Sequence, residues 1–272
     1  MRVPWALTVL PGRLLTGLWR ARGGQSFIVM HTGRVGSVVL GEMLREHPRV
    51  LFDHDPLHRR RLAWVARHGP AAPLREDPRA EVLRRAWRAR GRVYGVVVKP
   101  AQFNAGPLSW EAMLADLDRT LQPRRVAMTR RNLLRQVISG CRALELDQFH
   151  VYGGPVSGQT LQAPPDRLPQ FFGPPQTLRA ALEDKERYTA QALAAAEAAG
   201  PRGLHLVYED HIEADPYVGY SALCEFVGVA PDPAARPKLT RTGNRPVRAL
   251  VADPAAWEAA LAGTRWAWML DA

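Results

Sequence analysis

Short apolar runs alternate with helix-like stretches along most of this chain. Five runs predict strands, at residues 27–31, 50–53, 93–98, 124–128 and 203–208. The stretches between and after them have the apolar spacing of helices, at residues 37–47, 78–90, 108–121, 132–145, 176–199, 215–228 and 253–262. Because alternating strands and helices form βαβ units, consecutive strands run parallel. The pattern therefore predicts an α/β three-layer sandwich with a central, mainly parallel sheet flanked by helices.

The length and composition fit a soluble globular protein. The chain has 272 residues, of which 46% are hydrophobic and 23% charged, and residues 25–272 are expected to form a single domain. No apolar run approaches the roughly 20 residues that span a bilayer. Cys141 and Cys224 lack the spacing of a metal-ligand pair, which favours reduced thiols in a cytoplasmic protein.

The formal net charge of +11 suggests an anionic partner. However, arginine dominates and the only lysines are Lys99, Lys185 and Lys238. A GC-rich genome would also produce such a chain, so the charge alone does not identify a partner. No basic low-complexity tail is present, and nucleic acid is therefore not the expected partner.

Two segments stand apart from the alternating pattern. Residues 1–24 have leucines at helical spacing with arginines among them, which predicts an amphipathic segment. It either covers the main domain or docks on a membrane surface or a partner. Residues 147–175 are rich in Gly, Pro and aromatic residues, and a loop of this length is often a lid or a binding loop. We expect it to shape a substrate pocket, with a surface insertion as the alternative.

The stretch "FIVMHTGRVGSVVLGEMLREHP" at residues 27–48 reads as strand, turn and helix. A helix N-terminus offers free N–H groups to an anion, and Gly33 and Gly36 allow the backbone to approach it closely. Arg34 adds a permanent charge and Ser37 a hydroxyl donor. Both the G-x-x-x-x-G-K-[ST] and the G-x-G-x-x-G signatures are absent. The turn is thus P-loop-like without the P-loop lysine.

Four further stretches complete an ordered series. "RNLLRQVIS" has Arg131 and Ser139 eight residues apart, and "VYGVVVKPAQF" places Lys99 directly after a strand. "YEDHIEADP" and "LAGTRWAWML" follow in the last third of the chain. Together with "RVGSV" at residues 34–38, they resemble in order the motifs of the sulfotransferase family that uses 3′-phosphoadenosine 5′-phosphosulfate (PAPS). The chain departs from the family pattern at Val35 and Val38 and lacks the proline of the second motif.

The resemblance implies a site for PAPS that needs no metal. The turn would bind the 5′-phosphosulfate, with Arg34 stabilising negative charge on the leaving group. Arg131, rather than its neighbour Arg130, would bind the 3′-phosphate together with Ser139. The implied donor-binding residues are Thr32, Gly33, Arg34, Val35, Gly36, Ser37, Val38, Arg131, Ser139, Tyr208 and Arg241.

The resemblance also implies a general base at the end of the second strand. Asp55 is the assigned base, and Asp53 and His54 are its rivals. Since alternate residues of a strand face the same side, Asp53 and Asp55 are expected to point together. Lys99 would contact either the transferring sulfuryl group or the base. Arg34, Asp55 and Lys99 are thus the predicted catalytic residues.

The expected reaction transfers a sulfuryl group to a hydroxyl, or less readily an amine, of a carbohydrate, glycolipid or other small acceptor. A P-loop-like kinase or NTPase is the first alternative, weakened by the missing Lys-Ser/Thr pair. A basic protein that binds nucleic acid or an anionic membrane without catalysis is the second, and it predicts a steep salt dependence.

Overall fold

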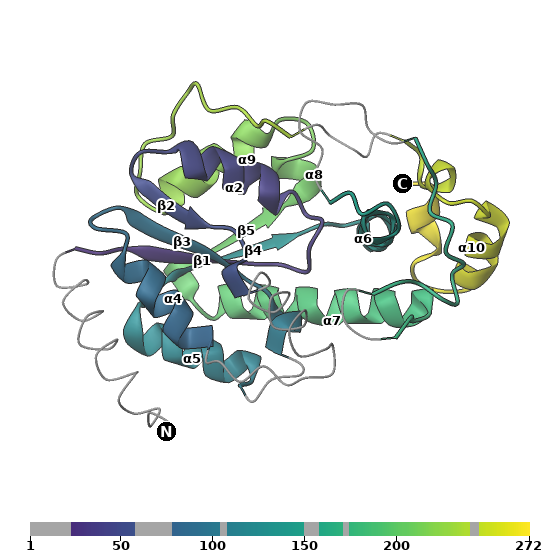
Figure 1. Cartoon of the computed structure of the whole chain (residues 1–272), viewed down its shortest axis with the longest axis horizontal. Coiled ribbons are helices and arrows are strands. Elements are labelled where there is room, and N and C mark those ends of the chain that lie inside the picture. The colour runs from purple at the N-terminus through teal and green to yellow at the C-terminus, as the bar shows by residue number, and fades with distance from the viewer. Residues whose placement is uncertain (1–22, 58–77, 104–107, 150–157, 171–173, 240–244) are drawn as a thin grey trace.

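The computed structural model describes residues 23–57, 78–103, 108–149, 158–170, 174–239 and 245–272. Its centre is a five-stranded sheet in the order β2-β3-β1-β4-β5, in which every pair of neighbours is parallel (Figure 1). The strands are β1 (Ser26–Met30), β2 (Val50–Asp53), β3 (Val93–Val98), β4 (Arg124–Thr129) and β5 (Gly203–Val207). The prediction of an α/β three-layer sandwich with a parallel sheet is confirmed.

The two faces of the sheet are covered by different helices, which is why its inner strands are apolar throughout. Ile28 of β1 and Val96 of β3 pack in one core. Phe27 and Val97, one position along, pack in the other core. The layer over the first face contains α4 (Pro78–Trp87), α5 (Trp110–Thr120) and α7 (Leu178–Glu197). The layer over the second face contains α2 (Ser37–Glu46), α8 (Tyr208–His211) and α9 (Pro216–Phe226).

A third core lies beyond the carboxyl ends of the strands (Figure 1). It joins α6 (Leu133–Glu145) to α10 (Pro254–Leu261) and to the short 3₁₀ segments η3 (Val247–Leu250) and η4 (Ala267–Leu270). The long helix α7 contributes Leu178 and Leu182 to this core and Ala192 to the core under the sheet. Helix α7 therefore runs from the sheet to this third core. Two other 3₁₀ segments, η1 (Pro100–Phe103) and η2 (Gly200–Arg202), precede α5 and β5.

The element boundaries lie within a few residues of those expected, with one difference after β5. Tyr208 was expected to end that strand but begins the short helix α8. The N–H groups of Ile212 and Glu213 bond to the Tyr208 carbonyl, at 2.9 and 2.8 Å. The next two residues of α8, Glu209 and Asp210, both accept hydrogen bonds from Arg131.

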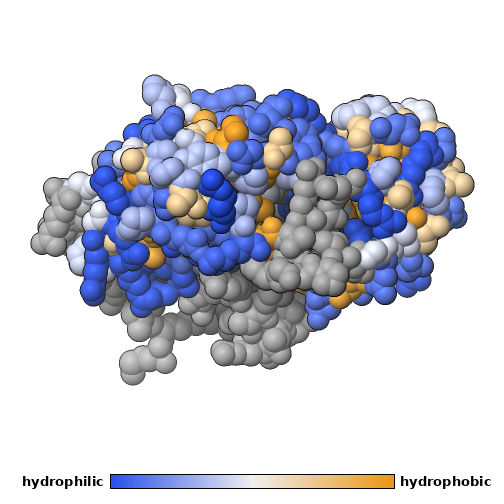
Figure 2. Space-filling model, turned by 90° about the horizontal axis from the view of Figure 1, so that it is seen from above, coloured by the Kyte–Doolittle hydropathy of each residue, from blue (hydrophilic) through white to orange (hydrophobic). Residues whose placement is uncertain are grey.

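Few large hydrophobic side chains are exposed among the described residues. Seen from above, the molecule carries mainly hydrophilic side chains with hydrophobic ones scattered among them (Figure 2). Trp87, Val218 and Trp268 are the exposed large hydrophobic side chains among the described residues. No helix within those residues is long and apolar enough to cross a membrane. The amphipathic segment expected at residues 1–24 lies outside the described residues, except for Gly23 and Gly24.

Candidate functional site

The turn between β1 and α2 has the backbone of an anion-binding loop. Gly33, Arg34 and Gly36 all have positive φ angles, of 88°, 55° and 79°. Gly36 is the N-cap of α2 and provides no side-chain hydrogen bond, so the first N–H groups of the helix are not capped by it. A positive φ at a non-glycine residue is uncommon and occurs often at functional sites. The turn can thus present N–H groups and the charge of Arg34 together.

The other predicted residues of the turn have different surroundings. Val35 is fully buried in the core under α2, and Ser37 is also buried. Val38 is partly buried. Thr32 donates a hydrogen bond from its hydroxyl to Oε1 of Gln136 on α6, at 2.8 Å. Val35 therefore anchors the turn, and only its backbone could contact a ligand.

Arg34 ties the turn to α6. Its Nε donates to Ser139 Oγ at 2.8 Å, and its Nη1 donates to the Phe149 carbonyl at 3.0 Å. Desolvation, followed by repulsion from Arg130 and Arg142, lowers the pKa of the guanidinium. The structure thus brings together Arg34 and Ser139, two residues that are 105 positions apart in the chain.

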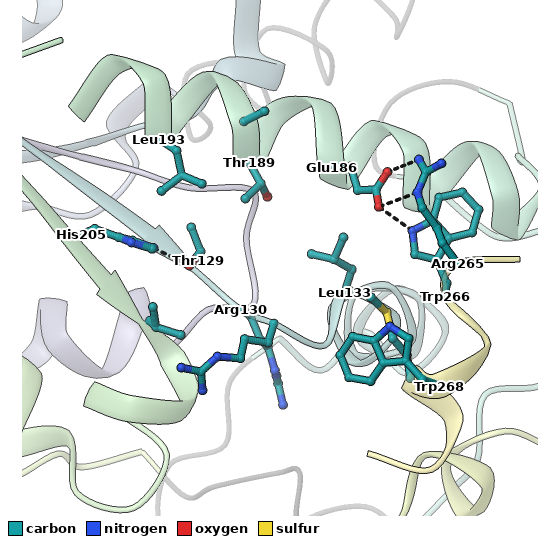
Figure 3. Close-up of a pocket in the computed structure, with 14 residues that line it drawn as sticks. Thr129, Arg130, Leu133, Glu186, Thr189, Leu193, His205, Arg265, Trp266 and Trp268 are labelled. Carbon is teal, nitrogen blue, oxygen red and sulfur yellow. Dashed lines mark hydrogen bonds and ion pairs between the residues drawn. The ribbon is translucent and has the colours of Figure 1, made fainter. Parts of the chain in front are cut away.

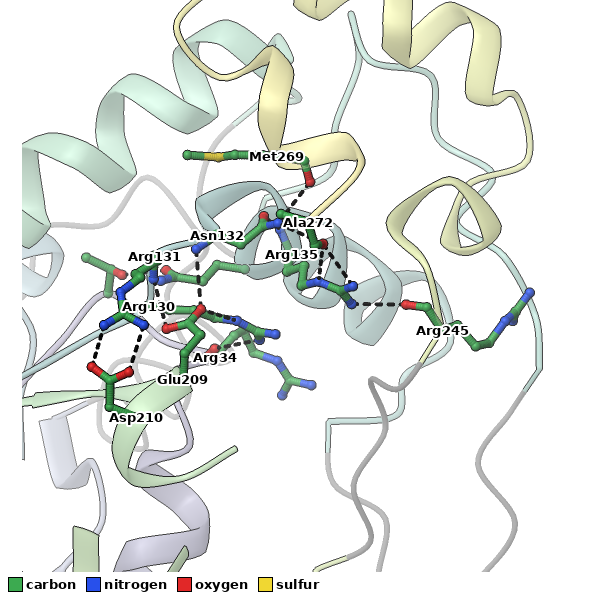
Figure 4. A network of polar contacts seen from close by, with 12 residues as sticks. Arg34, Arg130, Arg131, Asn132, Arg135, Glu209, Asp210, Arg245, Met269 and Ala272 are labelled. Carbon is green, nitrogen blue, oxygen red and sulfur yellow. Dashed lines mark hydrogen bonds and ion pairs between the residues drawn. The ribbon is translucent and has the colours of Figure 1, made fainter. Parts of the chain in front are cut away.

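Arg130 and Arg131 follow β4 and have very different surroundings (Figure 4). The guanidinium of Arg130 lies over the Tyr208 ring, 4.2 Å from its centroid, and 3.8 Å from a Glu209 carboxylate oxygen. Its Nη1 donates to the Arg34 carbonyl at 3.5 Å, whereas its buried Nε, the atom nearest Glu209, makes no hydrogen bond to the described residues. Arg130 is therefore a mostly buried cation whose guanidinium is only partly satisfied.

Arg131 instead points to the surface and forms a two-pronged ion pair with Asp210. Its side chain is 57% exposed, compared with 10% for Arg130. Arg131 and Ser139, which were expected to face the same phosphate, have different partners, because Arg131 pairs with Asp210 and Ser139 accepts from Arg34. The eight-residue spacing does not bring Arg131 onto α6, because the helix begins only at Leu133, after the Asn132 cap. Tyr208 lies with Arg130, not with Arg131, and Arg241 lies outside the described residues.

Asp55 and Lys99 meet at the ends of β2 and β3. The Lys99 ammonium is ion-paired with Asp55 Oδ2, and Gln102 Nε2 donates to Asp55 Oδ1 at 2.6 Å. Asp55 is buried and has a positive φ of 51°. The strained backbone and the two donors fix this carboxylate in place. Two of the three predicted catalytic residues are thus in direct contact.

Asp53 and Asp55, which were expected to point together, have different partners. Asp53 accepts from Arg85 Nη1 of α4 at 2.9 Å, whereas Asp55 pairs with Lys99. The alternation of a strand does not extend to Asp55, because β2 ends at Asp53 and Asp55 has a left-handed backbone. His54 packs instead beside Phe52, with their ring centroids 6.5 Å apart.

Three polar side chains that the sequence did not single out form hydrogen bonds with the turn. Lys185 of α7 donates from Nζ to the Thr32 carbonyl at 2.6 Å, and Gln136 accepts from the Thr32 hydroxyl. His31 is buried, and its Nδ1 accepts from the Gly33 N–H at 2.8 Å. Desolvation, with smaller contributions from Lys99 and His54, lowers the pKa of His31 well below its usual value, so its ring is neutral. No motif marked these residues, since Lys185 lies within an ordinary polar helix sequence.

Lys185 is an unusual lysine. Desolvation and repulsion from Lys99 lower its pKa from 10.5 to about 8. Between these two pKa values the unfolded chain binds the proton of Lys185 more tightly than the folded chain does. Lys185 therefore makes the free energy of unfolding rise as the pH increases.

We expect urea midpoints to rise less between pH 8 and pH 10 in Lys185→Met than in the wild type. Lys238→Met, which removes an exposed lysine paired with Glu46, should keep the wild-type dependence. Equal pH dependences in all three proteins would contradict this assignment.

A separate open pocket of about 550 Å³ lies beside β4 and β5, between α7 and the C-terminal segment (Figure 3). Leu193, Val207 and Trp268 line its apolar part. Thr129 and His205 also line it, with Thr129 Oγ1 and His205 Nε2 2.8 Å apart. Arg130 lines both this pocket and the candidate site, so the two are neighbours.

The segment 147–175 is described only in part. Arg142 Nη2 donates to the Gln159 carbonyl at 2.8 Å, and Leu161 forms a parallel bridge with Val251. Phe149 touches the site through its carbonyl, whereas Tyr152, Phe171 and Phe172 lie outside the described residues. The role of this segment in an acceptor pocket stays a prediction.

The comparisons with known proteins add no relative to this description. A scan against models of protein families finds no match to the chain. A search of curated proteins also finds no match.

Proposed function

We propose that this protein is a sulfotransferase that uses PAPS. The observation that carries the proposal is the meeting of two different groups at one edge of the sheet. One is the β1–α2 turn with Arg34, Arg130 and Ser139, and the other is the Asp55–Lys99 pair. The first group suits a nucleotide anion, and the second offers a carboxylate to an acceptor hydroxyl.

The donor half of the proposal rests on cations and N–H groups. The N-terminus of α2 and Arg34 would bind the 5′-phosphosulfate end, where charge develops as the bond to sulfur breaks. Arg130, stacked on Tyr208, is the better candidate for the 3′-phosphate, because its ion pair with Glu209 is long, at 3.8 Å, whereas Arg131 forms a two-pronged pair with Asp210. Asn132 caps the N-terminus of α6, and Ser139 lies within that helix. The Ser139 hydroxyl accepts a hydrogen bond from Arg34.

In the acceptor half, Asp55 takes the proton of the attacking hydroxyl. PAPS supplies the sulfuryl group, whose bond to the acceptor oxygen forms as its bond to the 5′-phosphate breaks. The products are the sulfated acceptor and adenosine 3′,5′-bisphosphate, and Asp55 passes its proton to water. Lys99 orients Asp55 through their ion pair. The proposed acceptor is a hydroxylated carbohydrate or glycolipid, and the proposed setting is the cytoplasm, where buried Cys141 and Cys224 stay reduced.

Thermal stabilisation by nucleotides tests the proposal. We expect adenosine 3′,5′-bisphosphate to stabilise the protein more than 5′-AMP or ATP at equal concentration, since only the bisphosphate has a 3′-phosphate. A preference for ATP with magnesium would favour the kinase or NTPase instead. Equal, salt-sensitive effects of all anions would favour the non-catalytic basic protein.

Arg130 and Arg131 form a matched pair for the 3′-phosphate. Arg130→Ala should weaken binding of the bisphosphate about 10- to 100-fold and remove its advantage over 5′-AMP, as expected for one charge-assisted contact. Arg131→Ala removes an exposed ion pair and should leave both affinities within about twofold. Isothermal titration of the two nucleotides measures this difference. A loss confined to Arg131→Ala would restore the assignment made from the motif.

A further inference from the structure

Lys185 reaches the candidate site from α7, on the side of the sheet opposite α2. Its ammonium has three N–H donors. One of them bonds to the Thr32 carbonyl at 2.6 Å, and this is its only hydrogen bond to the described residues. No carboxylate is ion-paired with it there, whereas Asp184, its neighbour in the chain, pairs with Arg187. Lys185 therefore brings a cation to the turn with N–H groups left to donate.

Gln136 provides a second unused donor beside the same residue. Its Oε1 accepts from the Thr32 hydroxyl, and its side chain is fully buried. Its Nε2 has no hydrogen-bond partner among the described residues. A buried amide N–H group without an acceptor costs about 1–3 kcal/mol. Two unsatisfied donors beside Thr32 indicate that an acceptor belongs there.

The charges around Thr32 point to an anionic acceptor. Lys99 is neutralised by Asp55, while Lys185 has no such partner and is repelled by both Lys99 and Arg34. A cation removed from water without a counter-charge is unfavourable, and a bound anion would offset that cost. Of the two ammonium groups at this edge of the sheet, Lys185 is thus the one available to a ligand.

We propose that Lys185 binds the sulfonate group of the donor directly, with Gln136 beside it. This inference rests on the proposed function and assigns separate roles to the two lysines. Lys99 orients Asp55, and Lys185 contacts the group that is transferred. Arg34 lies in the turn above and Lys185 extends from α7, so the phosphosulfate end is held from two layers of the fold.

A comparison of the intact donor with its product tests the contact, since only PAPS carries the sulfonate. Isothermal titration without acceptor is performed on the wild type, Lys185→Met, Lys185→Arg and Lys238→Met. Lys185→Met should weaken PAPS about 10- to 100-fold more than it weakens adenosine 3′,5′-bisphosphate. Lys185→Arg should recover part of the loss, and the surface control Lys238→Met should behave as the wild type.

Equal weakening of both nucleotides would overturn the proposal, because Lys185 would then only hold the turn through Thr32. An unchanged preference would overturn it as well. Should Lys185→Met fail to fold, the wild type still provides a test. With only three lysines, ¹³C-methylated ammonium groups are resolved by NMR, and the pKa of Lys185 should rise on binding PAPS more than on binding the bisphosphate. An equal rise with both would count against the contact.

Failure of the proposed function has a different signature. In that case the wild type binds neither nucleotide preferentially. Inorganic sulfate is then titrated while the Lys185 NMR signal is followed. A sulfate-dependent rise in the Lys185 pKa that is absent at Lys238 would support an oxyanion site at Thr32 in a protein of another activity. No response at Lys185 would overturn the oxyanion site too.

Discussion

Asp55→Asn is expected to lower sulfuryl transfer about 10²- to 10⁴-fold, the usual contribution of a general base. The amide has nearly the same shape as the carboxylate, but its single oxygen can accept from only one of the two donors, Gln102 or Lys99. The variant therefore loses both the ability to take the acceptor proton and the ion pair with Lys99. Binding of adenosine 3′,5′-bisphosphate should stay within about twofold of the wild type, because Asp55 belongs to the acceptor half of the site.

Asp53→Asn is the matched control. Asp53 lies only two residues away, but it pairs with Arg85 on α4 and makes no contact with Lys99 in the described structure. Its substitution should leave the transfer rate within about threefold, in keeping with one partly exposed ion pair. Single-turnover transfer of labelled sulfate measures both variants. A larger loss in Asp53→Asn than in Asp55→Asn would move the base to Asp53.

Gly36→Ala should destabilise the protein by about 3 kcal/mol. The φ of 79° is left-handed, which costs a residue with a Cβ about 1–2 kcal/mol. A Cβ would also lie 2.7 Å from Ile212 Cγ2 and 3.2 Å from Tyr208 Cδ2, and such overpacking adds about 1–3 kcal/mol. Tyr208 would be pushed from its place under Arg130, so nucleotide affinity should fall as well.

Gly33→Ala separates the two causes. Gly33 also has a left-handed φ, of 88°, but a Cβ there would meet nothing within 4 Å. Only the backbone cost of about 1–2 kcal/mol should appear. Urea unfolding of both variants provides the comparison. Equal destabilisation would show that contact with α8 adds nothing at Gly36, and the link between the turn and Tyr208 would be lost.

The sequence was sufficient for the sheet and its helices. The strands are short apolar runs because both faces are covered, and the helices between them have amphipathic spacing, so the periodicities differ clearly. The parallel arrangement then places every strand's carboxyl end at one edge, which includes the turn that follows β1. These predictions depend only on local pattern and on connection rules, whereas Asp55 and Lys99 were assigned from the resemblance to a family.

The apolar pattern of the sequence did not predict which residues the charged side chains contact. Arg130 and Arg131 are neighbours of the same type, and which one faces the site depends on where β4 ends and on Asp210 and Tyr208, about 80 positions later. Asp53 and Asp55 likewise diverge because the chain leaves the strand between them. In both cases a change in backbone direction over one or two residues decides the orientation of a charge.

The sequence by itself determined that the chain folds as an α/β sandwich with a glycine-containing turn and a carboxylate at the same edge. Only the tertiary structure decided which cations surround that turn. Arg34 meets Ser139, Arg130 meets Tyr208 and Lys185 meets Thr32 across long separations in the chain. The reason is physical: apolar periodicity records which face of an element is buried, but not which distant polar groups that burial brings together.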